Sequence, residues 1–306
     1  MTTFVPFDPT DQHLTWTGLT DALEACHALP PATVDDVFLY QDDNTLLNRS
    51  AWIPGLGLAV KCATIFPGNP ANGKPMIGGA VNLFSDKDGA LEAIVDFHLV
   101  TKWKTAGDSA LAARKLARPD SKNILIMGAG TVGRTLRSAY GELFPDAQFT
   151  IWNRSASGAE KFAAQFPGTK IAADLETAVG QADIVTSATM STQPILDGAW
   201  LKPGQHIDLI GAYRPDMREA NDIALLRSRV FVDNRTTVLD HIGELKIPLA
   251  EGVITRDHVV ADYYQMDLFQ RQSDDEITLF KNGGGAHLDL MTSRHILQTW
   301  MTKCSG

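Results

Sequence analysis

A glycine-rich loop is the first segment of this sequence whose residue types point to a definite chemistry. Gly128-Ala129-Gly130-Thr131-Val132-Gly133 fits the pattern G-x-G-x-x-G, follows the apolar run Asn123–Met127 and opens an expected helix at Thr131–Leu143. Small residues let backbone amides approach a pyrophosphate, and a helix N-terminus offers unpaired N–H groups to it. We therefore expect these six residues to bind a dinucleotide, and a tight turn without a ligand is the alternative.

The end of the next expected strand, Gln148–Trp152, predicts which dinucleotide binds. NAD-specific sites usually carry an acidic residue at this point, which binds the ribose 2′-hydroxyl. This chain has Asn153, Arg154 and Ser155 instead, and Arg154 can form charge-assisted hydrogen bonds with a 2′-phosphate. We therefore expect NADPH in preference to NADH. The alternative is that Arg154 is a solvated turn residue.

Composition and charge exclude several other classes of protein. The 306 residues, 44% of them hydrophobic, suffice for two packed domains. With 27 Lys+Arg, 36 Asp+Glu and no basic run, nucleic acid is not an expected partner. Cys26, Cys62 and Cys304 match neither a metal site nor a disulfide framework. Because Met1–Thr10 lacks a signal-peptide pattern and no apolar run is long enough to span a membrane, we expect a soluble, cytoplasmic protein.

The elements that must position the glycine loop alternate between strand and helix. This alternation begins after Pro119 and predicts a Rossmann-type, doubly wound α/β sheet. Its strands are expected at Asn123–Met127, Gln148–Trp152, Asp183–Ser187, His206–Ile210 and Arg229–Val232, and helices at Thr131–Leu143, Ser157–Gln165 and Leu175–Val179.

The residues before Pro119 lack this repeat and indicate an α+β domain. We expect strands at Val37–Tyr40, Leu56–Thr64 and Ala80–Phe84, and a helix at 105–117. Near-helical apolar spacing in Leu288–Met301 indicates a last helix that packs back on this domain. The predicted domains are therefore 119–287, which binds NAD(P), and a discontinuous domain of 1–118 plus 288–306.

Several segments together resemble the ornithine cyclodeaminase/mu-crystallin family. They are Val60–Asn69, Lys102–Ala112, the glycine loop, Trp152–Arg154 and Gly211–Glu219. Three C-terminal segments, Arg229–Asp233, Gly243–Glu251 and Gln272–Lys281, look closest to the bacterial Δ1-pyrroline-2-carboxylate reductases of that family.

The resemblance implies a homodimer in which the discontinuous domain forms the dimer interface and the substrate pocket. Lys61 matches the family's pocket lysine, which donates a proton to the imine nitrogen; a surface lysine is the alternative. Asp289 matches an acidic residue that opens the C-terminal helix near the active site, and an ordinary first-turn acid is the alternative. The further cofactor residues that the resemblance implies are Thr105, Ala188, Thr189, Met190, Gly211 and Ala212.

The substrate's carboxylate ligands depart from the family pattern. Lys104 stands where the family usually has an arginine, which keeps the charge but loses the bidentate fork. Arg49 lies in Asn48–Trp52, where relatives carry a pocket loop, and we expect it to serve as a carboxylate ligand, with an exposed loop arginine as the alternative. Trp52 lies in the same expected loop, so we count it among the substrate-binding residues.

The resemblance implies an NAD(P)H-dependent reductase of cyclic imino acids. Its expected reaction converts Δ1-pyrroline-2-carboxylate to L-proline, in proline metabolism, and Δ1-piperideine-2-carboxylate is a further substrate. The alternatives are an ornithine cyclodeaminase, an amino-acid dehydrogenase and a non-catalytic NADPH-dependent binding protein of mu-crystallin type. Tyr213 stands where cyclodeaminases have a functional aspartate, which argues against the first of these.

Overall fold

The computed structural model describes residues 2–304, which form two compact units. Unit 1 comprises the residues up to Gly107 together with those from Gly285 onward, and unit 2 comprises Asp108–Gly284. The limits expected from the sequence, after residue 118 and before residue 288, lie just beyond the end of helix α2 (Phe97–Leu116) and in the first turn of helix α9 (Ala286–Lys303). Within residues 2–304, every helix is too short or too polar to span a lipid bilayer.

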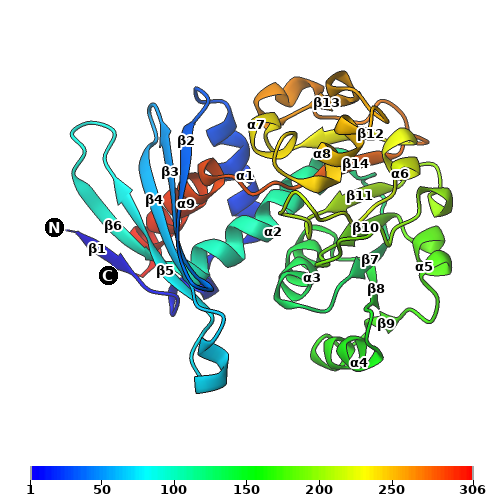
Figure 1. The fold of residues 1–306 in the computed structure, drawn as a ribbon, viewed down its shortest axis with the longest axis horizontal. Coiled ribbons are helices and arrows are strands. Elements are labelled where there is room, and N and C mark those ends of the chain that lie inside the picture. The colour runs from blue at the N-terminus through cyan, green and yellow to red at the C-terminus, as the bar shows by residue number, and fades with distance from the viewer. Residues whose placement is uncertain (1, 305–306) are drawn as a thin grey trace. The chain divides into compact units, whose positions relative to one another are not determined.

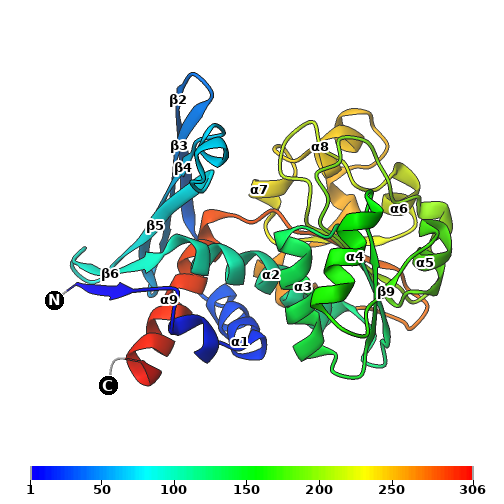
Figure 2. The same ribbon diagram turned by 90° about the horizontal axis from the view of Figure 1, so that it is seen from below.

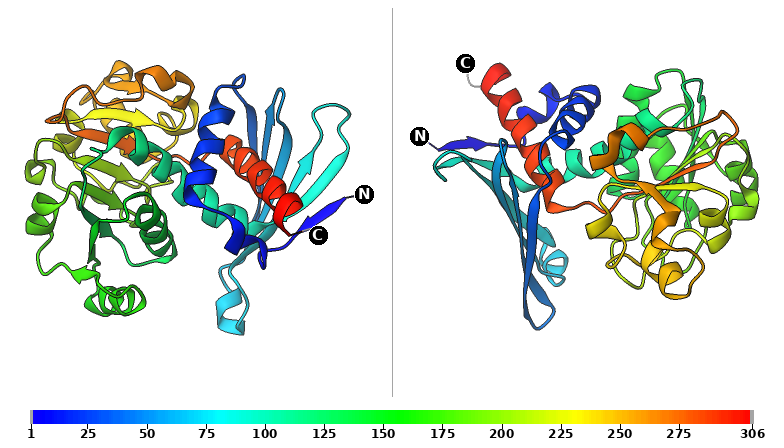
Figure 3. Two further views of the ribbon diagram at one scale, coloured as in Figure 1. Left: turned by 180° about the vertical axis from the view of Figure 1, so that it is seen from behind. Right: turned by 90° about the horizontal axis from the view of Figure 1, so that it is seen from above.

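Unit 1 is a six-stranded sheet with helices on one face (Figures 1 and 2). The strand order is β1-β6-β5-β4-β3-β2, in which β2 to β6 form an antiparallel meander and β1 joins β6 in parallel. Helix α9 packs along the strands and against α1, as Figure 3 shows. The elements are β1 (Thr3–Val5), α1 (Trp16–His27), β2 (Thr33–Gln41), β3 (Asn44–Ile53), β4 (Gly57–Ile65), β5 (Ile77–Phe84), β6 (Leu91–Asp96), the first half of α2, and α9.

Small residues let α9 lie close to the sheet. In β4, burial alternates strictly, and the buried positions Gly57, Ala59, Lys61 and Ala63 face the same side. Three of these four residues are glycine or alanine, so the helix can approach the strand closely. Among these four positions of β4, Lys61 carries the only polar side chain.

The segment expected to be a pocket loop is a strand, which corrects that prediction. Asn48–Trp52 belongs to β3, which pairs with β2 on one side and β4 on the other. The polar residues Asn48, Arg49 and Ser50 interrupt the apolar alternation that would have indicated a strand. β6 was also missed, and α2 begins at Phe97 rather than near Thr105.

Unit 2 is the doubly wound domain that the sequence predicts. Its eight strands are all parallel, in the order β13-β12-β14-β11-β10-β7-β8-β9 (Figure 1). The chain winds from β7 outward through β8 and then returns to build β10 and β11 on the other side, so the switch point lies between β7 and β10. The strands are β7 (Asn123–Met127), β8 (Gln148–Trp152), β9 (Lys170–Ile171), β10 (Ile184–Ser187), β11 (His206–Leu209), β12 (Arg229–Val232), β13 (Val259–Ala261) and β14 (Thr278–Lys281). The helices are the rest of α2, α3 (Thr131–Leu143), α4 (Ala156–Gln165), α5 (Leu175–Gln181), α6 (Asp222–Leu226), α7 (Arg235–Val238) and α8 (Gly243–Ala250).

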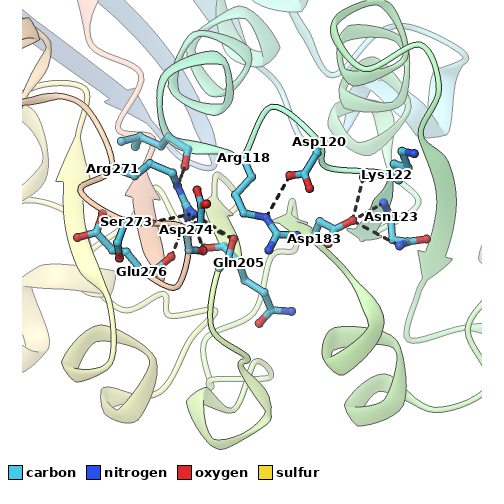
Figure 4. Close-up of polar contacts among 12 residues, drawn as sticks. Arg118, Asp120, Lys122, Asn123, Asp183, Gln205, Arg271, Ser273, Asp274 and Glu276 are labelled. Carbon is cyan, nitrogen blue, oxygen red and sulfur yellow. Dashed lines mark hydrogen bonds and ion pairs between the residues drawn. The ribbon is translucent and has the colours of Figure 1, made fainter.

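The amino ends of these strands are held together by a polar network (Figure 4). Just before β10, Asp183 accepts hydrogen bonds from the backbone N–H groups of Lys122 and Asn123, at 2.8 and 2.9 Å, and from Arg118 at 3.1 Å. Arg271 donates to the carbonyl oxygens of Leu116, Gly204 and Glu276. At the amino ends of the strands, these hydrogen bonds therefore connect the neighbouring loops to one another.

Candidate active site

Lys61 and Arg49 lie opposite each other in neighbouring strands of unit 1. The register pairs Arg49 of β3 with Lys61 of β4, and Asp36 of β2 with Arg49. Directly paired residues point to the same face of a sheet, which here is the face that α9 covers. The structure thus brings two of the predicted site residues together.

Asp289, in the first turn of α9, meets Lys61 on this face. Lys61 Nζ donates to Asp289 Oδ1 at 2.9 Å, and the two residues are 7% and 1% exposed. The Lys61 ammonium also lies 4.8 Å from the centre of the Phe97 ring. Among the described residues, Asp289 Oδ2 has no hydrogen-bond partner, so this buried carboxylate keeps one acceptor for a ligand.

Three cations act on Asp289. Burial alone would raise the pKa of Asp289, but the charges of Lys61, Lys104 and Arg49 and the hydrogen bond from Lys61 lower it overall. Asp289 is therefore an anion at neutral pH.

Lys104 joins the same cluster from helix α2. It is 7% exposed, and its charge contributes, after burial and the nearby His27, to lowering the pKa of His287 well below its ordinary value. Arg49 also pairs with Asp36 through Nη2 at 2.8 Å. The site thus gathers Lys61, Lys104 and Arg49 around Asp289, and these cations can attract an anionic ligand.

Trp52 lies apart from this cluster. Its position in β3 has the opposite parity from Arg49, so its side chain lies on the other face of the sheet. There it is 50% exposed, donates from Nε1 to Asp86 at 2.7 Å and lines an apolar cavity of about 370 Å³. Its assignment to the substrate stays a prediction that this geometry does not support.

A second cavity, of about 220 Å³, lies in unit 2 at the carboxyl ends of β7, β8 and β10. It brings together eight of the predicted cofactor residues, from the glycine loop, the end of β8 and the loop after β10. They are Gly128, Ala129, Gly130, Asn153, Arg154, Ala188, Thr189 and Met190; Trp152, Ser191 and Ile195 complete the lining.

The glycine loop has the geometry that a bound pyrophosphate needs. Gly128 has a φ of +106°, and a Cβ there would lie 2.6 Å from the Ala188 carbonyl oxygen. At Gly133 a Cβ would lie 2.0 Å from the Gly128 carbonyl oxygen, so α3 can pack on the loop only through glycine. Gly130, which precedes α3, has open space at its Cα and no side-chain cap. The N-terminal amides of α3 are thus available to an anion.

The three residues after β8 have different roles in the structure. Asn153 accepts from the Ala129 N–H at 3.0 Å and so fixes the glycine loop, while Ser155 caps α4 at Gly158. Arg154 is exposed, and among residues 2–304 its side chain makes no hydrogen bond or ion pair. Of the three, Arg154 is therefore the side chain that is available to a 2′-phosphate.

Sequence reasoning missed Glu219, a fully buried carboxylate beside the cavity. It binds Thr189, Gly211 and Ala212, three residues predicted to hold the cofactor. Its only signal in the sequence was its place at the end of the Gly211–Glu219 segment. Thr131, Val132 and Gly133 lie in the first turn of α3, and Thr105 lies on α2 in unit 1.

Comparison with known proteins identifies the family. The profile of the ornithine cyclodeaminase/mu-crystallin family matches residues 55–303. The chain belongs to this family. The resemblance inferred from the sequence segments is thereby confirmed.

Several members of the family are similar to this chain over most of its length. A Δ1-pyrroline-2-carboxylate reductase of Paracoccus denitrificans is 48% identical over 96% of this chain and 95% of that protein. A ketimine reductase mu-crystallin of Rattus norvegicus is 32% identical over 79% of this chain and 76% of that protein. The structure of a Thermococcus litoralis Δ1-pyrroline-2-carboxylate reductase, in complex with NADH and L-proline, superposes with a TM-score of 0.89 at 25% identity and covers 98% of both chains.

Proposed function

We propose that this member of the family is an NAD(P)H-dependent reductase that converts Δ1-pyrroline-2-carboxylate to L-proline and also accepts Δ1-piperideine-2-carboxylate. The observation that carries the proposal is the buried Lys61–Asp289 pair. Lys61 Nζ donates to the Asp289 carboxylate, yet two of its three N–H groups have no hydrogen-bond partner among the described residues. A buried cation with unused donors is what protonation of an imine nitrogen requires.

Each requirement of the reaction has a residue in the clusters described above. The imine nitrogen takes a proton from Lys61 Nζ while the imine carbon is reduced. Asp289 positions Lys61 Nζ through their hydrogen bond, and its free Oδ2 accepts an N–H of the product. Lys104 and Arg49 supply positive charge for the substrate carboxylate.

The residues of unit 2 fit a dinucleotide, which supplies the hydride when bound. The absence of side chains at Gly128 and Gly133 and the uncapped N-terminus of α3 leave backbone N–H groups open to its pyrophosphate. Arg154 suits the 2′-phosphate of NADPH.

Arg154→Ala tests the cofactor preference. A charge-assisted hydrogen bond contributes roughly 1.5–3 kcal/mol, so the parent should bind NADPH at least about tenfold more tightly than NADH. The variant should bind both with similar Kd values in fluorescence titration. Equal affinities in the parent would contradict the assignment.

The substrate is tested by NADPH oxidation in a panel of imines. Pyrroline-2-carboxylate should give the highest kcat/KM, ahead of piperideine-2-carboxylate and of pyruvate with ammonia or methylamine. L-Ornithine with NAD⁺ should release no ammonia, because Tyr213 replaces the aspartate of the cyclodeaminases. A highest rate with pyruvate and ammonia would indicate an amino-acid dehydrogenase instead, and NADPH binding without turnover of any imine would indicate a binding protein.

The open face of the unit 1 sheet supports a homodimer. Val37, Leu39 and Trp52 share this face, and all three are about half-exposed. A second copy of the chain would cover them, and light scattering should then give twice the 33.3 kDa mass of the chain. A cytoplasmic location, with a small-molecule substrate and neither nucleic acid nor membrane as partner, stays our expectation.

A further inference from the structure

Glu219 is a buried carboxylate to which the proposed reaction gives no role. It is fully buried, and its two oxygens accept five hydrogen bonds. Oε1 accepts from Ser187 Oγ at 2.6 Å and from the backbone N and Oγ1 of Thr189 at 2.8 and 2.7 Å. Oε2 accepts from the backbone N–H groups of Gly211 and Ala212, at 2.6 and 3.2 Å. One side chain thus binds the ends of two strands.

The loops that follow β10 and β11 are in direct backbone contact at Thr189 and Gly211. A Cβ at Gly211 would lie 1.9 Å from the Thr189 carbonyl oxygen and 2.6 Å from Glu219 Oε1. Because no side chain fits between them, the loop after β10 and the loop after β11 form one layer with the Glu219 carboxylate inside it. A carboxylate offers about four acceptor sites, more than any neutral side chain, which suits Glu219 to this group of donors.

A second buried acid holds Glu219 itself. Glu244, at the start of α8, accepts from the backbone N–H groups of Glu219 and Ala220, at 2.7 and 3.0 Å. The Glu219 carbonyl accepts from Ile195 and Leu196, both at 2.9 Å. The position of the carboxylate is therefore fixed from both sides by backbone contacts.

The loops that Glu219 binds belong to one half of the nucleotide site. In a doubly wound sheet, the two halves of a dinucleotide lie on either side of the switch point, here between β7 and β10. The glycine loop and Arg154 follow β7 and β8, on the side of the pyrophosphate and the 2′-phosphate. Thr189, which also lines the cavity that Arg154 lines, and Gly211 follow β10 and β11, on the side of the switch point that remains for the nicotinamide.

We propose that Glu219 is a positioning residue for the nicotinamide half of the cofactor. It acts through Thr189 and Gly211, which it holds at the carboxyl ends of β10 and β11. The proposal rests on the proposed function only in requiring that this site binds NAD(P).

The test compares Glu219→Gln, which affects the carboxyl end of β10, with a substitution of Asp183, a carboxylate at the amino end of β10. Asp183, just before β10, also accepts two backbone N–H groups, but it lies in the amino-end network of Figure 4. Each variant is titrated with NADPH and with 2′-phospho-ADP-ribose, which lacks only the nicotinamide. A carboxamide replaces one acceptor oxygen by a donor, so Glu219→Gln must lose hydrogen bonds to one of the two loops.

Glu219→Gln should raise the Kd of NADPH by at least about tenfold, which is the effect of about one hydrogen bond to a charged group. The same variant should change the Kd of 2′-phospho-ADP-ribose by less than about twofold. Asp183→Asn should lower the Tm and leave both Kd values unchanged. Equal weakening of both ligands by Glu219→Gln would show a merely structural role and overturn the proposal, and so would unchanged binding of both.

A milder variant decides the matter if Glu219→Gln does not fold. Ser187→Ala removes one of the five donors and keeps the carboxylate. This variant should raise the Kd of NADPH about threefold and leave the Kd of 2′-phospho-ADP-ribose unchanged. Unchanged NADPH binding by this variant would then overturn the proposal. Because no imine is present in these titrations, a parent that binds NADPH but reduces no imino acid refutes the proposed function alone, whereas one that binds neither nucleotide refutes both.

Discussion

Two buried lysines, one in each unit, show how differently the same side chain is used. Lys61 on β4 of unit 1 donates one hydrogen bond, to the side chain of Asp289. Lys281 on β14 of unit 2 is completely buried and donates to the backbone carbonyl oxygens of Leu209 and Asn282, at 2.9 and 2.5 Å. One lysine keeps donors for a ligand, and the other gives its hydrogen bonds to the fold.

The charges around the two lysines also differ. Burial lowers the pKa of Lys281, while Glu219, Glu244, Asp233 and Asp208 all act to raise it. Around Asp289, by contrast, three cations, Lys61, Lys104 and Arg49, act on one carboxylate. Lys281 is thus one cation among four acids, whereas Lys61 shares its carboxylate with two further cations.

Lys281→Met should give the largest loss of stability. Removing the partner of a buried charge cluster typically costs about 3–5 kcal/mol, because the remaining acids are left uncompensated. Urea unfolding should show this loss, while the exposed Lys74→Met changes the free energy of unfolding by less than about 0.5 kcal/mol. If the Lys281→Met protein is as stable as the parent, the acids around Lys281 do not need its charge. The contrast between a structural and a catalytic lysine would then be wrong.

Lys104→Met should give the next largest effect, on substrate binding. A charge-assisted hydrogen bond contributes roughly 1.5–3 kcal/mol, so the KM for pyrroline-2-carboxylate should rise by at least about tenfold. Lys104→Arg keeps the charge and should keep a KM near that of the parent. Steady-state kinetics at saturating NADPH measures both, and an unchanged KM in Lys104→Met would leave Arg49 as the carboxylate ligand.

Glu244→Gln should give the smallest effect, on the pH dependence of stability. Burial and the charge of Glu219 raise the pKa of Glu244 from 4.5 to about 7. Between these values the folded protein holds a proton that the unfolded chain releases, so this residue makes stability fall as the pH rises, by at most about 1.4 kcal/mol per pH unit. Chemical unfolding between pH 4.5 and 7 should show a shallower fall for the variant. An identical slope in parent and variant would rule out this protonation.

The sequence predicted unit 2 better than unit 1, and the reason is physical. After the exposed Asn123, the run Ile124–Met127 is buried on both faces of a parallel sheet, so it is apolar throughout. β3 has one face under α9 and one open face, and its polar residues Asn48, Arg49 and Ser50 conceal it. Alternation of apolar side chains is the signal of such strands, and here three consecutive polar residues, among them the site residue Arg49, interrupt it.

The candidate site was predictable where a residue type has a local motif and not where a role depends on distant contacts. The glycine loop carries its own pattern, and Lys61 stands in a segment that resembles the family. Glu219 also ends a segment that resembles the family, Gly211–Glu219, but its role depends on Ser187 and Thr189, which precede it by 32 and 30 residues. Its contacts with Thr189 and Gly211 emerge only when β10 and β11 lie side by side.

The kinetics of Lys61→Met test most directly the claim that Lys61 donates the proton. Positioned acid catalysis contributes about 10²–10⁴-fold, so kcat/KM for pyrroline-2-carboxylate at neutral pH should fall at least about a hundredfold, with the Kd of NADPH unchanged. A variant that keeps near-parental kcat/KM would contradict the account, because another group would then deliver the proton.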